Sequence, residues 1–231
     1  MSRYPRYAIY YAPTRHHALY RFGAELLGYD AFSGDGLPFP DAVMARVPDW
    51  RDISQEPRAY GFHATLKPPF ALAADATEPE LLAACERFAT IPRPIPSIAP
   101  VVDAIGSFIA VVPATPSAEL NRLAQDCVEA FDEFRAPLTP EDRARRNPAA
   151  LTAAQLAHLD RWGYPYVMEE FRFHMTLTGR LPAERRGALL ALLRDRLAAL
   201  ALAELAIDRV AVFRQDAAAT PFRVIGQFGL R

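Results

Sequence analysis

The sequence predicts an α+β protein made of two similar halves, and three observations support this. The pentapeptide FHATL at Phe62–Leu66 has a near copy, FHMTL, at Phe173–Leu177. Strand-like and helix-like patterns alternate along the chain. Their order, strand, helix, H-x-T strand, helix and strand, describes residues 7–105 and returns over 107–231 with one extra strand. We therefore expect two pseudo-symmetric lobes, 1–106 and 107–231, whose antiparallel-rich sheets face each other across a central cleft, with helices outside and with strand exchange left open.

The first half opens with an aromatic strand and a capped helix. Residues 7–12 (YAIYYA) have the composition of a strand, and Thr14 is the expected cap of a helix over 15–27. Residues 29–58 are rich in Gly, Pro and Asp, so we expect a mostly irregular loop that could fold over the cleft. The first H-x-T strand should cover residues 60–66 and stop at Pro68-Pro69.

The remaining elements follow from capping signals, apolar periodicity and turn residues. Thr77 and Glu80 form a capping box for a helix that ends near Ala89. Further strands are expected over 98–105, 107–112, 167–178, 207–214 and 222–229, and further helices over 117–134, 152–162 and 182–203. Residues 136–147 form a basic insert whose Arg143, Arg145 and Arg146 either touch an anionic substrate or remain solvated.

Composition limits the classes of function. The 231 residues are 51% hydrophobic and 23% charged, as in a folded globular protein. A formal net charge of −1 supplies no general attraction for long nucleic acids. The two cysteines, Cys85 and Cys127, have no C-x-x-C spacing, so we expect buried free thiols. We find no leader-like segment and no apolar stretch long enough to span a membrane, and we expect a cytoplasmic protein.

The duplicated pentapeptide carries the candidate chemistry. In a strand, His63 and Thr65 point to one face while Phe62 and Leu66 point to the other, and the second copy places His174 and Thr176 in the same way. An imidazole is a base or an acid near neutral pH, so a pair can deprotonate an attacking water and protonate a leaving oxygen at a phosphodiester. The threonine hydroxyls can bind phosphate oxygens. Duplicated strands with purely structural histidines are the alternative.

Neighbouring side chains are less well determined. Strand alternation places Lys67 on the face of His63, and Arg172 on the face of His174, where a cation would offset phosphate charge; each is equally explained as a solvated charge at a strand end. Tyr11 either lines the cleft or fills the core. Zinc is the chemical competitor, but no third ligand stands at suitable spacing beside either histidine. Walker, G-x-S-x-G and G-x-G-x-x-G segments are absent from the sequence.

Two H-x-T motifs half a chain apart resemble the two-histidine (2H) phosphoesterase superfamily. The strings YGFHATLKPPF (Tyr60–Phe70) and RWGYPYVMEEFRFHMTLTGRL (Arg161–Leu181) are similar to its phosphonate-metabolism branch. The resemblance implies two ferredoxin-like lobes and metal-independent action on a phosphodiester. It also implies that His63, Thr65, His174 and Thr176 occupy the motif positions.

The expectation from the sequence is therefore a hydrolase, a cyclic phosphodiesterase. His63 and His174 would be its acid–base pair, Thr65, Thr176, Lys67 and Arg172 would bind a small phosphate-containing substrate, and no metal or cofactor would be needed. A short RNA end is a less favoured substrate. A non-enzymatic module that binds a phosphate ligand or nucleotide in the same cleft is the alternative, and the oligomeric state is left open.

Overall fold

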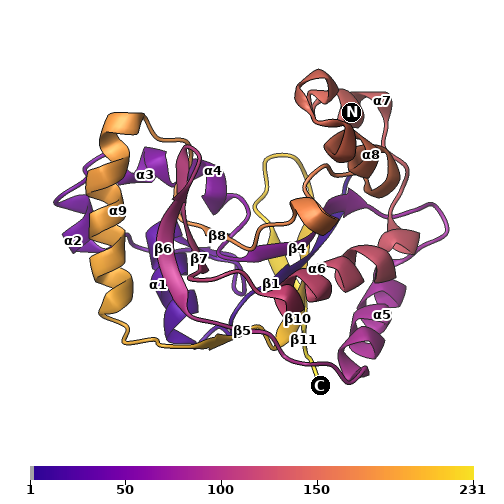
Figure 1. Ribbon diagram of the computed structural model, residues 1–231, viewed down its shortest axis with the longest axis horizontal. Coiled ribbons are helices and arrows are strands. Elements are labelled where there is room, and N and C mark those ends of the chain that lie inside the picture. Colours follow the sequence, from indigo (N-terminus) through magenta and orange to yellow (C-terminus); the bar gives the residue numbers. More distant parts are fainter. Residues whose placement is uncertain (1–2) are drawn as a thin grey trace.

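The computed structural model describes residues 3–231 and has the expected α+β class (Figure 1). Its main sheet has seven strands in the order β11-β10-β1-β4-β8-β7-β6, and every neighbouring pair is antiparallel. The bounds of these strands are β1 Arg6–Tyr11, β4 Ala64–Ala71, β6 Pro100–Ile105, β7 Phe108–Pro113, β8 Met175–Thr176, β10 Arg209–Gln215 and β11 Arg223–Gly229. Two small ribbons pair β2 (Tyr29–Asp30) with β3 (Asp35–Gly36), and β5 (Ser97–Ile98) with β9 (Leu205–Ala206).

The two motif strands are direct neighbours, which the sequence did not predict. β4 pairs with β8 through Ala64 and Met175, so the two sheets expected to face each other are parts of one continuous sheet. Strands from both halves of the chain are mixed in it. The C-terminal hairpin β10–β11 lies beside β1, and β6 lies beside β7. The division into lobes 1–106 and 107–231 stays a prediction.

Most of the longer helices cover the sheet face opposite the motif side chains. The longer helices are α1 Ala18–Leu27, α5 Glu78–Thr90, α6 Ala118–Ala130, α8 Ala153–Trp162 and α9 Ala183–Ala198. In Figure 1, α9 lies beside β6 on the left, while α5 and α6 lie on the right. Apolar residues of α1, α5, α6 and α9 share one core cluster with Tyr7, Ile9 and Tyr11 of β1. Tyr11 therefore fills the core, because alternation along β1 sends Tyr10 to the other face.

Helix ends follow local capping chemistry, with one difference. Capping boxes at Thr77 and Thr152 begin α5 and α8, and Gly28 ends α1 with φ 68°. The expected cap Thr14 is wrong. The ring of His17 caps α1 instead, because its Nδ1 accepts a hydrogen bond from the Leu19 amide at 3.1 Å.

Residues 29–58 are more regular than expected. Besides β2 and β3 they form three one-turn helices, α2 Asp41–Met44, α3 Trp50–Ile53 and α4 Gln55–Arg58. The fully buried Trp50 joins the main core and donates an indole hydrogen bond to the Leu26 carbonyl at 2.7 Å. The prediction of a loop failed because a few buried apolar residues hold a polar, Gly- and Pro-rich segment in place, which local propensity does not reveal.

The motif strands also depart from their predicted ranges. β4 continues through Pro68 and Pro69 to Ala71, and its register against β1 shifts twice along this stretch. Prolines occur in strands at such irregularities, where no ladder hydrogen bond is required from them. The second motif strand is reduced from 167–178 to two residues, because a 3₁₀ turn at Met168–Glu170 precedes it and Met168 has a φ of 54°. Within residues 3–231, no helix has the length and hydropathy of a membrane span.

Candidate functional site

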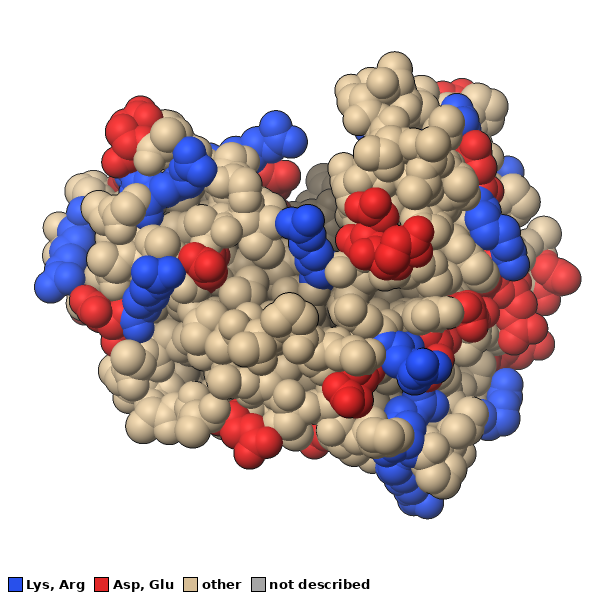
Figure 2. Space-filling model, viewed as in Figure 1, with Lys and Arg blue, Asp and Glu red and all other residues tan. Residues whose placement is uncertain are grey.

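The pairing of β4 with β8 brings both H-x-T motifs to one place. Ala64 is opposite Met175, and continuing this antiparallel register by one residue sets His63 beside Thr176 and Thr65 beside His174. All four side chains line one cleft of about 580 Å³. Other walls come from Glu56 and Pro57 of α4 and from Tyr164 after α8. In Figure 2 the surface is hollowed at the top, between the parts that carry α4 and α8.

His63 is held by its neighbours on three sides. Its Nδ1 lies 2.9 Å from the Gly61 carbonyl, and its Nε2 lies 3.3 Å from the Thr65 hydroxyl. The ring stacks on Tyr10 at a centroid distance of 3.7 Å and an interplanar angle of 19°. Because a carbonyl only accepts hydrogen bonds, Nδ1 carries the proton and Nε2 is free to accept one from Thr65. Gly61 has a φ of 73°, a left-handed conformation that glycine adopts without a steric penalty.

His174 repeats this arrangement. Its Nδ1 lies 2.7 Å from the carbonyl of Arg172, again two residues earlier, and its ring lies 5.6 Å from that of Phe108. The same reasoning puts the proton on Nδ1, so both imidazoles present an unprotonated Nε2 to the cleft. The two copies of the motif thus hold both histidines in the same tautomer, with the proton on Nδ1.

Burial keeps both imidazoles neutral. The pKa of His63 is lowered to about 4, chiefly by desolvation; the hydrogen bond to the Gly61 carbonyl opposes this shift and the nearby charge of a protonated His174 adds to it. Desolvation also lowers the pKa of His174 against an opposing effect of the Arg172 carbonyl. At pH 7 the cleft therefore contains two proton acceptors.

Stability should fall in acid because of His63. A pKa of about 4 in the folded protein against about 6.5 in the unfolded chain means that the unfolded state binds more protons between these values. The contribution of His63 should reduce the free energy of unfolding by about 2 kcal/mol from pH 7 to pH 5. Urea unfolding of His63→Gln should show a pH dependence weaker by this amount. His16→Gln, at an exposed position, is the control. Equal slopes for wild type and His63→Gln would contradict the burial of a neutral imidazole.

Lys67 does not join the cleft chemistry. The register shift in β4 pairs Thr65 with Tyr10 but Lys67 with Ile9. The side chain of Lys67 therefore points to the core face, whereas regular strand alternation would place it on the face of His63. Its Nζ donates to the Val128 carbonyl at 2.8 Å and to Asp132 at 3.1 Å. Burial lowers the pKa of Lys67 to about 8, and Asp132 opposes this shift. The expectation that Lys67 shares the face of His63 is wrong, and Lys67 instead forms a buried ion pair with Asp132.

Arg172 is also placed differently from the expectation. Its side chain is exposed and does not line the cleft, although its carbonyl positions His174. The predicted long strand is broken here, so alternation along residues 172–178 no longer holds. Thr178 does line the cleft, but its hydroxyl is engaged by the Ile109 amide at 3.0 Å and the Gly179 carbonyl at 2.9 Å.

Several cleft residues were missed by sequence reasoning. Cations at the cleft come from Arg6, Arg146 and Arg180, and aromatic walls from Tyr10, Tyr60 and Tyr164. The place of Tyr10 could have been predicted from the sequence, because in a strand it points to the face opposite the buried Tyr11. Arg6 had none, since its approach to the cleft depends on strand order. Arg146, which follows α7 (Pro140–Ala144), was expected either to touch an anionic substrate or to remain solvated, and it lines the cleft. The described residues contain no group of three or more His, Cys, Asp and Glu side chains placed to hold a metal ion.

Similar proteins supply the remaining evidence. A family model described as "Protein of unknown function (DUF1045)" matches residues 65–223, which is most of the chain. A curated relative from Janthinobacterium sp. (strain Marseille), named ribose 1,5-bisphosphate phosphokinase PhnN, is 34% identical over 223 residues, covering 94% of this chain and 49% of the relative. A protein of the same name from Laribacter hongkongensis (strain HLHK9) is 33% identical over 180 residues, covering 76% of this chain and 40% of the relative.

The chain spans about half the length, or less, of these curated relatives. Among solved structures, a conserved protein of unknown function from Agrobacterium tumefaciens covers 96% of this chain and 85% of its own, with a TM-score of 0.47 and 12% identity.

The names of the relatives overturn the expected activity. The sequence predicted a hydrolase that opens a cyclic phosphodiester, whereas the relatives are named as kinases, which transfer a phosphoryl group. The prediction of a cyclic phosphodiesterase is therefore wrong. The prediction failed because imidazoles and hydroxyls in a cleft indicate acid–base groups and phosphate binding, but they do not indicate which group accepts the phosphoryl group.

Proposed function

We propose, from the premise that this chain belongs to the DUF1045 family of proteins of unknown function, that its cleft binds a phosphorylated ribose. The name of the curated relatives supports ribose as the sugar. We further propose a place in phosphonate metabolism and kinship with the two-histidine superfamily. The duplicated motif supports the kinship, and the longer strings around the two motifs, Tyr60–Phe70 and Arg161–Leu181, support the place in phosphonate metabolism.

One observation carries this proposal. Two imidazoles and two threonine hydroxyls meet in one cleft, and the guanidinium of Arg180 also lines it. Hydroxyls and guanidinium groups are donors suited to phosphate oxygens. Each neutral Nε2 can accept a proton from a sugar hydroxyl that attacks a phosphoryl group, or from a phosphate monoanion as it binds. We assign His63 and His174 to proton transfer and Thr65 and Thr176 to phosphate binding.

The proposal assigns no phosphoryl donor to this cleft. The sequence has no G-x-x-x-x-G-K-[ST] loop to cradle a nucleoside triphosphate. The residues that line the cleft include one carboxylate, Glu56, and so do not resemble a site for a divalent metal with its nucleotide. The sugar phosphate is therefore the ligand that the cleft residues fit.

Binding of ribose 5-phosphate, measured by titration calorimetry, tests the proposal. We expect the wild type to bind ribose 5-phosphate and not ribose, and His174→Ala and Thr176→Val each to raise the Kd about tenfold, as loss of one hydrogen bond to a charged group does. His158→Ala is the control, because His158 lies on α8, pairs with Glu169 and does not line the cleft. Equal affinity for ribose and its phosphate would refute the proposal.

A further inference from the structure

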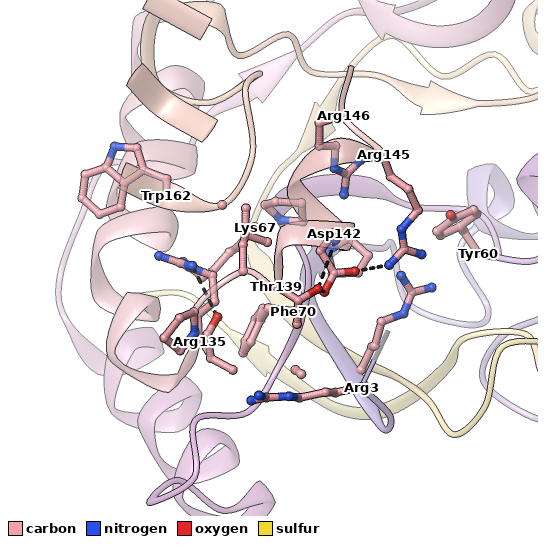
Figure 3. Close-up of a pocket in the computed structure, with 18 residues that line it drawn as sticks. Arg3, Tyr60, Lys67, Phe70, Arg135, Thr139, Asp142, Arg145, Arg146 and Trp162 are labelled. Atoms are coloured by element: carbon pink, nitrogen blue, oxygen red, sulfur yellow. Dashed lines mark hydrogen bonds and ion pairs between the residues drawn. The ribbon is translucent and has the colours of Figure 1, made fainter. Parts of the chain in front are cut away.

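A second pocket adjoins the cleft. It has a volume of about 200 Å³ and lies between the Pro68–Ala71 end of β4 and the insert that carries α7 (Figure 3). Arg6, Tyr60, Pro68, Pro69 and Arg146 line both the pocket and the cleft, so the two cavities adjoin at these residues. Typical small-molecule sites measure roughly 300 to 1,000 Å³, so the pocket suits one small group of a ligand rather than a second molecule.

The pocket is strongly basic. Its cationic lining residues are Arg3, Arg6, Lys67, Arg135, Arg145 and Arg146, against the single carboxylate of Asp142. In Figure 3, Arg145 and Arg146 lie at its upper edge, Arg3 at its lower edge and Tyr60 at its right. Much of this charge is compensated, because Lys67 and Arg135 pair with Asp132, and Arg145 pairs with Asp142.

Arg6 and Arg146 differ from these paired cations. Arg6 donates to the neutral side chain of Gln215, with its Nε 2.9 Å from Oε1, and lies over the rings of Tyr4 and Phe222. Arg146 lies over the ring of Tyr164 at 4.8 Å. Within residues 3–231, neither guanidinium forms an ion pair with a carboxylate. Aromatic faces hold both groups in place without neutralising them, which leaves two oriented positive charges where cleft and pocket meet.

We propose that Arg6 and Arg146 bind a second anionic group of the ligand, so that the site takes a bisphosphorylated sugar in a single orientation. One phosphate lies at the imidazoles and threonine hydroxyls, and the other lies at the mouth of the basic pocket. This inference rests on the proposed function and extends it from a ribose phosphate to a ligand with two separated phosphates. Guanidinium forks suit this task because they can donate two parallel hydrogen bonds to a phosphate.

Calorimetric titration with two sugars tests the assignment. We expect the wild type to bind ribose 1,5-bisphosphate at least tenfold more tightly than ribose 5-phosphate. Arg6→Gln and Arg146→Gln should each reduce this preference to about threefold or less, while the affinity for ribose 5-phosphate changes by less than twofold. Arg122→Gln, an exposed position on α6 that lines neither cavity, is the matched control and should keep the full preference.

The outcomes separate this inference from the proposed function. If the wild type binds both sugars equally, or if Arg146→Gln keeps the full preference, the second anion site is refuted while the cleft remains a site for one phosphate. If neither sugar binds the wild type, the proposed function fails and this inference with it. Arg146 is exposed, so its variant remains informative even if Arg6→Gln disturbs the packing of β1.

Discussion

Replacing Gly23 with alanine should lower the free energy of unfolding by about 3 kcal/mol, the upper part of the range for overpacked cores. Gly23 lies in α1, against the ring of Phe62. A Cβ at this position would lie 2.2 Å from Cγ of Phe62 and 2.3 Å from both Cδ atoms, which is far inside van der Waals contact. Phe62 is fully buried and directly precedes His63, so relief of this overlap must move the first motif.

Two further variants control this experiment, which is read by urea unfolding at pH 7. Gly187→Ala, at an exposed position of α9 with no atom within 4 Å of the added Cβ, should stabilise the protein by about 1 kcal/mol through helix propensity. The double variant Gly23→Ala/Phe62→Leu should recover part of the stability that Gly23→Ala loses. Unfolding of Gly23→Ala at the wild-type urea concentration would show that α1 and the motif do not pack as closely as described.

Replacing Asp132 with asparagine should lower the free energy of unfolding by about 3 kcal/mol, the lower end of the range for a broken buried ion pair. The carboxylate of Asp132 lies 3.1 Å from Nζ of Lys67, 2.8 Å from Nε of Arg135 and 3.0 Å from Nη1 of Arg161. Lys67 is 1% exposed, so Asp132→Asn leaves its ammonium without a counter-ion in a desolvated place. Urea unfolding at pH 7 measures the loss.

Lys67→Met provides the complementary test, because it removes the buried charge and leaves Asp132 paired with Arg135 and Arg161. We expect it to cost less stability than Asp132→Asn, since an apolar chain of similar length can fill the space. Its affinity for ribose 5-phosphate should stay within twofold of wild type. A tenfold loss of that affinity would restore Lys67 to the cleft and contradict its structural role.

Local patterns were reliable where the physics is local. The capping box at Thr77, the helix end at Gly28 and the terminal hairpin occur as the sequence predicts, because each depends on residues close together in the sequence. Lys67 and Arg172 were misplaced because strict alternation was assumed in strands that are shifted or broken. A β-bulge reverses the side-chain face, and no residue type near Leu66 marks one unambiguously.

The sequence by itself determined that this is an α+β protein with two copies of a His-x-Thr motif, and that these four side chains alternate with buried Phe and Leu. Only the tertiary structure decided that the two motifs lie on adjacent strands, that both histidines expose an unprotonated Nε2, and that Arg6 and Arg146 stand beside them. The physical reason is that side-chain periodicity is a property of a few neighbouring residues, whereas strand order, register shifts and desolvation depend on contacts between segments far apart in the chain.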